Sequence, residues 1–207
     1  MIDHISWFGH GTFAITGTPL IYINPWRITR SERPADIILV THDHYDHCSL
    51  ADIAKLRGEH TRVIGNERVA REIPGCEVLL PWQSIAVERA CIKAVPAYSP
   101  DDSRHSRQEG GLGFVISLNY YDIYYAGDTK LIPEMASIHP DIAILPIDGN
   151  GTLTPFEAAL AIQQMRPRWA IPSNWSITSG GTNRVDAQVF QREVGDAAEV
   201  VLLTPER

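Results

Sequence analysis

The stretch His42-Asp43-His44-Tyr45-Asp46-His47 directly follows the apolar run Ile37-Ile38-Leu39-Val40. In an extended chain, residues two apart point the same way, so His42 and His44 can converge on one metal ion. Asp46 and His47 follow a turn and can reach a second ion, as two-metal hydrolases require when their ions lie about 3.5–4 Å apart. A polar loop that is merely rich in histidine is the alternative, but loops of this composition rarely follow a buried strand directly. The stretch therefore predicts a metal centre.

Three other segments complete a pattern that resembles a known family. Gly127-Asp128-Thr129 follows the strand-like residues 121–126, the opening segment 7–13 reads Trp-Phe-Gly-His-Gly-Thr-Phe, and residues 95–98 read Val-Pro-Ala-Tyr. Together with residues 42–47, these segments resemble the metallo-β-lactamase superfamily. The opening segment is similar to the branch that includes L-ascorbate 6-phosphate lactonase.

The order of elements indicates α/β or α+β layering. The resemblance implies the particular arrangement: a single domain over residues 1–207, of the α+β class, built as an αββα four-layer sandwich. Two β-sheets would pack face to face with helices outside and with the metals at one edge.

Two ligands that the resemblance leads us to expect are absent. Ser99 stands where the family usually has a histidine after the Pro-Ala pair, and Asn174 stands where another histidine usually ends the Ile-Pro strand. Asn174 offers an amide oxygen, which suits hard cations better than zinc. His105 is a substitute for the first missing ligand, although a solvated loop histidine is the alternative interpretation.

The residues assemble into a ligand set for one or two divalent ions. One ion would be held by His42, His44 and His105, with Asp128 bridging to a second ion held by Asp46, His47 and Asp128. Zinc is the first choice of metal and manganese the second. Open coordination positions are typical of catalytic rather than structural sites.

A metal-bound hydroxide is the nucleophile that such a centre predicts, because a bound water can have its pKa lowered from 15.7 to about 7. Asp46 and Asp128 are the predicted catalytic residues, and Asp46 would also orient the hydroxide and pass a proton to the leaving group. Because two ligands are missing, we expect one metal to be held tightly and the other loosely.

Other residues are candidates for binding substrate or supporting the ligands. His10 lies in the opening segment and is expected to form a hydrogen bond to a ligand. Arg104 in the long loop 97–112 could meet a phosphate or a carboxylate. Tyr98 and Asn174 complete this group. Cys48 follows His47 directly, but we expect it to be a small buried residue that opens the next helix.

The composition of the chain limits the kinds of binding partner that we expect. The chain has 207 residues, 44% of them hydrophobic, and a formal charge of −7 without a block of lysine or arginine, so nucleic acid is disfavoured as the main partner. Its three cysteines lack metal-binding spacing. No leader pattern and no apolar run of about 18 residues is visible, so we expect a cytoplasmic protein that does not enter membranes. We expect a small-molecule substrate, and the sequence is compatible with a homo-oligomer.

The leading hypothesis is a metal-dependent hydrolase acting on a small ester, lactone or phosphoester. A degenerate member of the fold that binds a ligand without turning it over is the first alternative, suggested by Ser99 and Asn174. An RNA-processing nuclease is the second, and the acidic composition weakens it.

Hydrophobic alternation and turn residues predict the secondary structure. Helices are expected from Ser49 to about Arg57, from Thr154 to about Met165 and from about Val185 to Glu193. Strands are expected at 2–7, 12–16, 20–24, 37–40, 62–65, 77–80, 84–88, 91–95, 113–118, 121–126, 142–146, 169–173 and 199–203.

Overall fold

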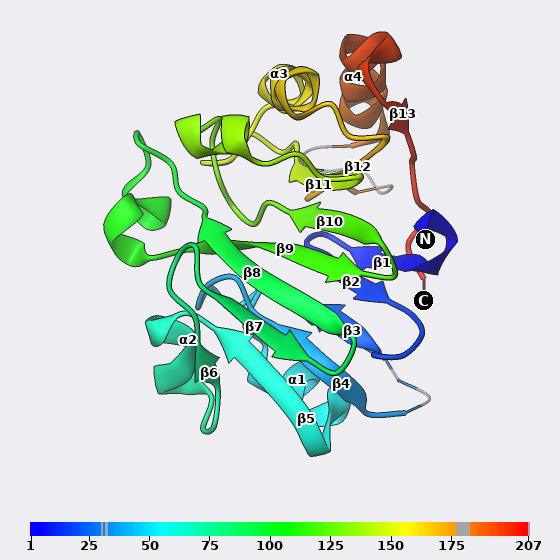
Figure 1. The fold of residues 1–207 in the computed structure, drawn as a ribbon. Coiled ribbons are helices and arrows are strands. Elements are labelled where there is room, and N and C mark those ends of the chain that lie inside the picture. The colour runs from blue at the N-terminus through cyan, green and yellow to red at the C-terminus, as the bar shows by residue number, and fades with distance from the viewer. Residues whose placement is uncertain (30, 32, 177–182, 207) are drawn as a thin grey trace.

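The computed structural model describes residues 1–29, 31, 33–176 and 183–206. In this part of the chain, two mixed β-sheets of six and seven strands face each other, with helices on both outer sides (Figure 1). The four-layer α+β arrangement expected from the resemblance is confirmed.

The six-stranded sheet follows the chain order. Its strands are β1 (Ile5–Gly9), β2 (Thr12–Ile15), β3 (Ile21–Ile23), β4 (Ala35–Leu39), β5 (Arg57–Gly65) and β6 (Glu77–Val78). Strands β1 to β3 are antiparallel neighbours, whereas β3 to β6 run parallel.

Strand β4 explains why the motif is preceded by an unbroken apolar run. Ile37 and Leu39 belong to the core between the sheets, while Ile38 and Val40 face the outer core beneath the helices. A parallel strand covered on both faces is expected to be apolar at every position. The end of β4 is therefore rigid, and it holds the first histidine of the motif in place.

Helices α1 (Leu50–Leu56) and α2 (Glu67–Glu72) contribute to that outer core. The predicted N-cap of α1 is confirmed, because the Ser49 hydroxyl accepts a hydrogen bond from the Asp52 amide. The sequence patterns missed α2, which has only six residues and one buried side chain, Val69.

The seven-stranded sheet has the spatial order β13-β12-β11-β10-β9-β8-β7. Its strands are β7 (Ser84–Val87), β8 (Ala90–Pro96), β9 (Leu112–Leu118), β10 (Tyr121–Tyr125), β11 (Ile142–Pro146), β12 (Trp169–Ser173) and β13 (Glu199–Val200). Strands β7 to β10 form an antiparallel meander, and β10 to β13 are parallel.

Helices α3 (Pro155–Met165) and α4 (Arg184–Val194) lie together beyond the seven-stranded sheet (Figure 1). Their buried residues, including Ile162 and Phe190, belong to the same core as both sheet interiors. In the described part of the chain, no helix has both the length and the apolar character needed to cross a bilayer.

Among the predicted strand boundaries, three differ most from the structure. Residues 2–4 form a 3-10 helix before β1, and β5 begins directly at Arg57 instead of at residue 62. The last strand has only two residues where five were expected. The 3-10 helix is closed by a local hydrogen bond from the His4 amide to the Met1 carbonyl. The start of β5 depends instead on a neighbour distant in sequence, since Arg57 lies opposite Ala35 of β4, and local pattern does not report such pairing.

We predict that Thr154→Ala lowers the free energy of unfolding by about 1 kcal/mol, the usual effect of losing an N-cap side chain. The Thr154 hydroxyl accepts from the Glu157 amide, and the Glu157 carboxylate accepts from the Thr154 amide, so the capping box predicted for α3 is complete. Urea denaturation followed by circular dichroism measures the change. Gln164→Ala, at an exposed position of α3, serves as the control and should change stability by less than about 0.5 kcal/mol. Equal stability of the two variants would show that the cap is dispensable.

Candidate metal centre

The candidate ligands come together where strands from both sheets end. His42 follows β4, Asp128 follows β10, and Asn174 follows β12. Open sheets with parallel strands commonly bind ligands at the carboxyl ends of those strands. The site thus lies at the edge where the two sheets meet.

The first half of the motif is arranged as the sequence predicted. His42 Nε2 lies 3.1 Å from His44 Nδ1, and the hydroxyl of Thr41 lies 2.9 Å from the other ring nitrogen of His42. Within the described residues, His42, His44 and His105 form a group whose potential ligand atoms are all within 4.8 Å of one another. The structure therefore brings together the three imidazoles expected to hold the first ion.

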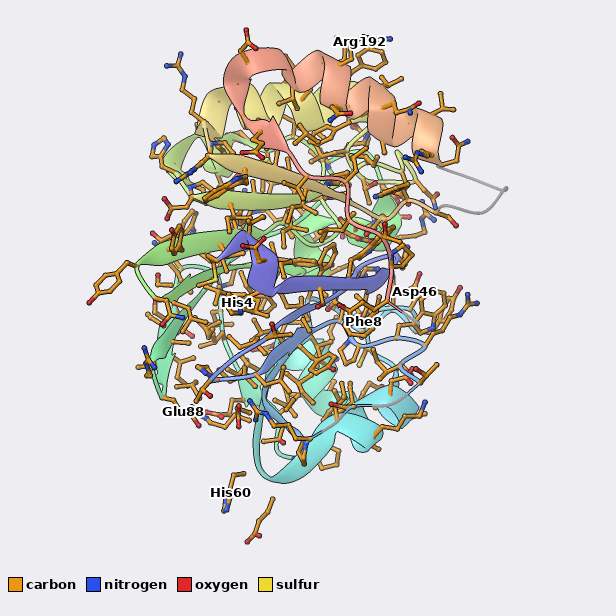
Figure 2. The ribbon with its side chains drawn as sticks, turned by 90° about the vertical axis from the view of Figure 1, so that its right-hand side faces the viewer. His4, Phe8, Asp46, His60, Glu88 and Arg192 are labelled. Carbon is orange, nitrogen blue, oxygen red and sulfur yellow. The ribbon has the colours of Figure 1, made fainter. Side chains whose placement is uncertain are left out.

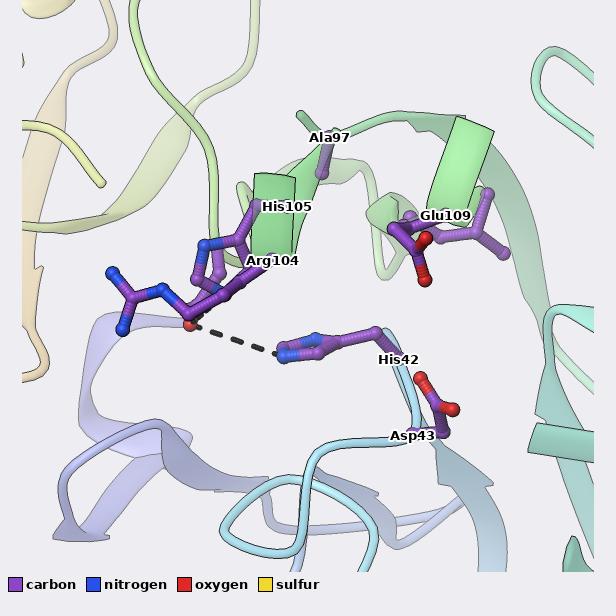
Figure 3. Close-up of a pocket in the computed structure, with 9 residues that line it drawn as sticks. His42, Asp43, Ala97, Arg104, His105 and Glu109 are labelled. Carbon is purple, nitrogen blue, oxygen red and sulfur yellow. Dashed lines mark ion pairs between the residues drawn. The ribbon is translucent and has the colours of Figure 1, made fainter. Parts of the chain in front are cut away.

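His105 reaches this position because its loop is folded back on itself. It ends a short 3-10 helix, Ser103–His105, and its carbonyl accepts a hydrogen bond from the Ser99 amide at 2.7 Å. The side chain of Ser99 is buried and donates to the carbonyl of Gly151. Ser99 is thus a structural residue of the loop, and His105 supplies the imidazole from six positions further on (Figure 3).

The loop that carries His105 packs so closely against Gly151 that position 151 has no room for a side chain. A Cβ atom at position 151 would overlap the carboxylate of Asp102 and lie 3.0 Å from His105 Nδ1, and the φ of Gly151 is +77°. Gly127, at φ +68°, has the same role before Asp128, since a Cβ there would lie 2.5 Å from the Leu112 carbonyl oxygen.

One carboxylate oxygen is the centre of the cluster. Asp128 Oδ2 lies 3.4 Å from His105 Nε2, 3.5 Å from His47 Nε2 and 3.9 Å from His42 Nε2, and the Asp128 side chain is only 10% exposed. Figure 3 shows His42 and His105 facing each other across a small pocket, with an ion pair of His42 drawn as a dashed line. This position suits the bridging role expected of Asp128.

The remaining motif residues form a second group beside the first. Potential ligand atoms of His10, Asp46 and His47 lie within 4.8 Å of one another, as do those of His42, His47 and Asp128. His10 Nε2 lies 3.1 Å from Asp46 Oδ2, which matches the hydrogen bond to a ligand expected of His10. Figure 2 places Asp46 away from His4 and His60, and both of these histidines are exposed.

Electrostatics act differently on the imidazoles of the first position. Burial opposes protonation of His105, yet the neighbouring Asp128 carboxylate raises the pKa of that ring above its ordinary value. Burial and the neighbouring His47 hold the pKa of His42 well below its ordinary value, so this ring is neutral at neutral pH. Burial alone would raise the pKa of Asp128, but the surrounding histidines, His47 and His105 foremost, hold it well below the ordinary range. Burial likewise opposes ionisation of Asp46, yet the hydrogen bond with His10 and the charge of His47 lower its pKa to about 2.

The donor set fits a divalent cation. Both ring nitrogens of His105 are buried without a hydrogen-bond partner, which is costly unless another group satisfies them. A tetrahedral zinc ion with Zn–N distances of about 2.0–2.1 Å separates its ligand nitrogens by about 3.3–3.4 Å. The 3.1 Å between His42 and His44 is close to that separation. Imidazole nitrogens with a carboxylate suit zinc and other first-row metals.

Asn174 faces the cluster with its nitrogen. Its Nδ2 donates to Asp128 Oδ1 at 3.0 Å, while its Oδ1 is buried without a partner. A flipped amide would set two oxygens against each other. The amide oxygen of Asn174 is therefore not directed at the Asp128 carboxylate, and its role as a replacement for the missing histidine stays a prediction.

Tyr98 is turned away from the cluster. Its hydroxyl donates to Glu134 at 3.1 Å, and the guanidinium of Arg107 lies over its ring. Its backbone instead supports the site, because the Tyr98 amide donates to the Thr129 hydroxyl next to Asp128. The predicted contact of the Tyr98 side chain with substrate is not supported by this position.

Arg104 lies at the mouth of the site, where its guanidinium is held by the Asp102 carboxylate at 2.6 Å. Cys48 is buried, and burial raises the pKa of its thiol to about 12. The expectation that Cys48 is a packing residue is confirmed, and its thiol is not poised to ionise.

Sequence reasoning missed two residues that contact the motif. Asn24 is buried at the end of β3 and lies 2.7 Å from His47 Nδ1, and Thr41 contacts His42. A buried strand ending in Asn-Pro was the only available signal for Asn24, and it is an ordinary turn signal as well.

A cavity of about 520 Å³ opens above the ligands. This volume is within the range of about 300–1,000 Å³ typical of small-molecule sites. Its lining includes His10, His44, Asp46, Arg104, His105, Asp128 and Asp148. The half-buried Asp148 accepts a hydrogen bond from the Thr152 hydroxyl, which lowers the pKa of the Asp148 carboxyl, but desolvation outweighs this effect and raises that pKa.

The beta-lactamase superfamily domain (Lactamase_B_3) matches residues 4–174, which include every ligand candidate described above. The chain belongs to this superfamily. A UPF0173 metal-dependent hydrolase of Thermococcus onnurineus is 32% identical over 220 residues, covering 97% of this chain and 96% of the relative. A second, from Thermococcus kodakarensis, is 31% identical with the same coverage.

Solved structures agree with the fold. A metal-dependent hydrolase from Parabacteroides distasonis superposes with a TM-score of 0.86 at 26% identity, covering 97% of this chain and 93% of that one. The metallo hydrolase Igni18 from Ignicoccus hospitalis gives a TM-score of 0.80 at 22% identity, covering 98% and 95%. The enzyme class predicted from the sequence, a metal-dependent hydrolase of the metallo-β-lactamase superfamily, is confirmed by these relatives.

We predict that His105→Ala weakens Zn²⁺ binding by more than about 100-fold, because losing even an outer hydrogen-bond partner of a ligand lowers metal affinity about 10- to 100-fold. Competition with a chromophoric chelator measures the affinity. His60→Ala, at an exposed position far from Asp46 (Figure 2), should leave it unchanged. Unchanged affinity in His105→Ala would identify His105 as an ordinary loop histidine.

Proposed function

We propose that this protein hydrolyses a small ester, lactone or phosphoester with a divalent cation, zinc or manganese, held by His42, His44 and His105 next to Asp128. The observation that carries the proposal is the convergence of these four side chains at the floor of a cavity of small-molecule size. The resemblance to the lactonase-like branch supports lactones as members of the substrate class.

When bound, the cation polarises a carbonyl or phosphoryl oxygen and lowers the pKa of a water molecule in its coordination shell. The chain's own contribution begins with three imidazoles from two segments. His42 and His44 come from the rigid end of β4, and His105 comes from the loop after β8, so the ligands enclose the site from two sides.

Asp46 is the residue proposed to handle protons. With a pKa of about 2 it is ionised at neutral pH, so its carboxylate can accept a hydrogen bond from an attacking water and orient that water. A proton transferred to this carboxylate is held weakly and passes readily to a leaving group. His10 holds the carboxylate in position through the 3.1 Å contact with Oδ2. Asp46 also lines the cavity, within reach of a bound substrate.

Arg104 is proposed to recognise an anionic group of the substrate. It is the one cationic side chain, apart from histidines, among the described residues that line the cavity, and its exposed guanidinium lies at the rim. Guanidinium groups bind phosphate and carboxylate through paired hydrogen bonds. The pairing with Asp102 holds the side chain across the opening.

The other functions considered from the sequence are less well supported. A binding module without turnover has no need for a cluster of three imidazoles and a carboxylate that opens into a cavity. An RNA-processing nuclease would need a basic face, and the chain carries a net charge of −7.

A panel of lactones, aryl esters, thioesters, phosphomonoesters and phosphodiesters, assayed with Zn²⁺ or Mn²⁺, tests the proposal. We expect turnover in at least one class, loss of that turnover after treatment with a chelator, and recovery when metal is added back. Absence of turnover with every class at high enzyme concentration would contradict the proposal.

We predict that Asp46→Asn lowers kcat/KM on any active substrate by at least about 100-fold, since general acid–base groups contribute about 10²–10⁴-fold. Binding of a non-hydrolysable substrate analogue should change little, as measured by calorimetry. Asp101→Asn, an exposed aspartate of the loop after β8, is the control and should retain activity. Full activity in Asp46→Asn would remove Asp46 from the mechanism.

A further inference from the structure

Asn24 contacts the metal centre without being a candidate ligand. It is fully buried at the end of β3, with a left-handed φ of 46° that asparagine tolerates better than most residues. Its side-chain amide lies between Thr41 and His47. The orientation of this amide determines which ring nitrogen of His47 carries the hydrogen and which is free to bind a metal.

Two hydrogen-bond partners determine the orientation of the amide. The backbone N–H of Thr41, which can only donate, lies 2.9 Å from Asn24 Oδ1. On the other side, the Tyr125 hydroxyl gives its hydrogen to the Gly11 carbonyl at 2.8 Å and lies 3.2 Å from Asn24 Nδ2, so it can accept there. The Thr41 hydroxyl lies 2.9 Å from the same nitrogen, and His47 Nδ1, at 2.7 Å, is nearer than either oxygen. Turning the amide over would set two donors against each other at Thr41.

The Asn24 Nδ2 group therefore donates to His47 Nδ1 at 2.7 Å. A ring nitrogen that accepts a hydrogen bond carries no hydrogen, so the hydrogen of a neutral His47 is on Nε2. This is the atom that lies 3.5 Å from Asp128 Oδ2. A metal on Nε2 would require His47 to lose both ring hydrogens or Asn24 to break its contact with Thr41.

His42 provides the contrast within the same motif. Its Nδ1 faces the Thr41 hydroxyl at 2.9 Å, and this oxygen can accept a hydrogen from the ring. Nε2 of His42 is then free to bind a metal, the arrangement that an outer hydrogen-bond acceptor ordinarily produces in a ligating histidine. The neighbouring groups therefore leave Nε2 of His42 free to bind a metal, whereas they place a hydrogen on Nε2 of His47.

The other candidate ligands of the second position are also occupied by N–H or imidazole groups. Asn174 Nδ2 donates to Asp128 Oδ1 at 3.0 Å, and His10 Nε2 lies 3.1 Å from Asp46 Oδ2. Asp128 Oδ1 and Asp46 Oδ2 therefore each have a protein partner where a second cation would need a lone pair, and His47 Nε2 carries a hydrogen there.

We propose that this protein holds one divalent cation, at His42, His44 and His105, and that the amide N–H groups of Asn24 and Asn174 prevent a second cation from binding at His47 and Asp128. Asn24 is the determinant, because it selects the ring nitrogen on which His47 carries its hydrogen. The inference rests on the proposed function in one respect, that the first position binds metal.

Asn24→Asp tests this with a nearly isosteric change. One carboxylate oxygen can accept from the Thr41 amide and the other from His47 Nδ1–H, which frees His47 Nε2. After loading with Zn²⁺ and dialysis, elemental analysis should find one equivalent in the wild-type protein and two in Asn24→Asp. Asn119→Asp, which adds the same charge at an exposed position beside Arg89 in the turn between β9 and β10, is the matched control and should bind one equivalent.

A second measurement does not depend on the variant folding. Long-range ¹H–¹⁵N correlation spectra of the metal-free wild-type protein should show the hydrogen of His47 on Nε2, and on Nδ1 in a folded Asn24→Asp variant. Two equivalents in the wild-type protein, a hydrogen on Nδ1 of wild-type His47, or a single equivalent in Asn24→Asp would each overturn the inference and leave the proposed hydrolase standing. No binding of metal by the wild-type protein would instead overturn the proposed function.

Discussion

The site depends on one buried carboxylate. Asp128 has little contact with water, and an ionised carboxylate in such a place is costly unless hydrogen bonds and positive or polar groups compensate. Compensation comes from histidines at the end of β4 and in the loop after β8, and from the amide of Asn174 after β12. The electrostatic requirement of Asp128 thus connects both sheets at one edge, and a divalent cation among the same atoms would satisfy it further.

The supporting residues determine how the clustered groups differ from one another. His42 and His47 belong to one six-residue stretch, yet the first faces a hydroxyl and the second faces an amide N–H. Asp46 and Asp128 are both ionised, but Asp46 lies in the open cavity beside His10, whereas both oxygens of Asp128 are surrounded by protein groups. Similar side chains therefore have different chemical tasks because their hydrogen-bond partners differ, which is the general way in which proteins assign roles within a site.

The chain combines a widely shared fold with local features of its own. Relatives of nearly the same length are named metal-dependent hydrolases, and solved structures superpose over almost the entire chain. Function nevertheless depends on individual residues of a site and not on the fold alone. In this site such residues are Ser99 with His105 in the loop after β8, and the two asparagines, Asn24 and Asn174, that face the cluster with their nitrogen atoms.

Sequence alone determined the features that depend on neighbours along the chain. The apolar run before the motif, the spacing of His42 and His44, and the caps of α1 and α3 are local, and the structure has them where the patterns placed them. The resemblance supplied the four-layer arrangement, which periodicity could not distinguish from other α/β layers. Only the tertiary structure decided that His105 reaches the ligand group, that Tyr98 turns toward Glu134, and that Asn24 donates to His47. These outcomes depend on contacts between atoms far apart in sequence, such as Asn24 with Tyr125, and no local pattern records which end of an amide meets which partner.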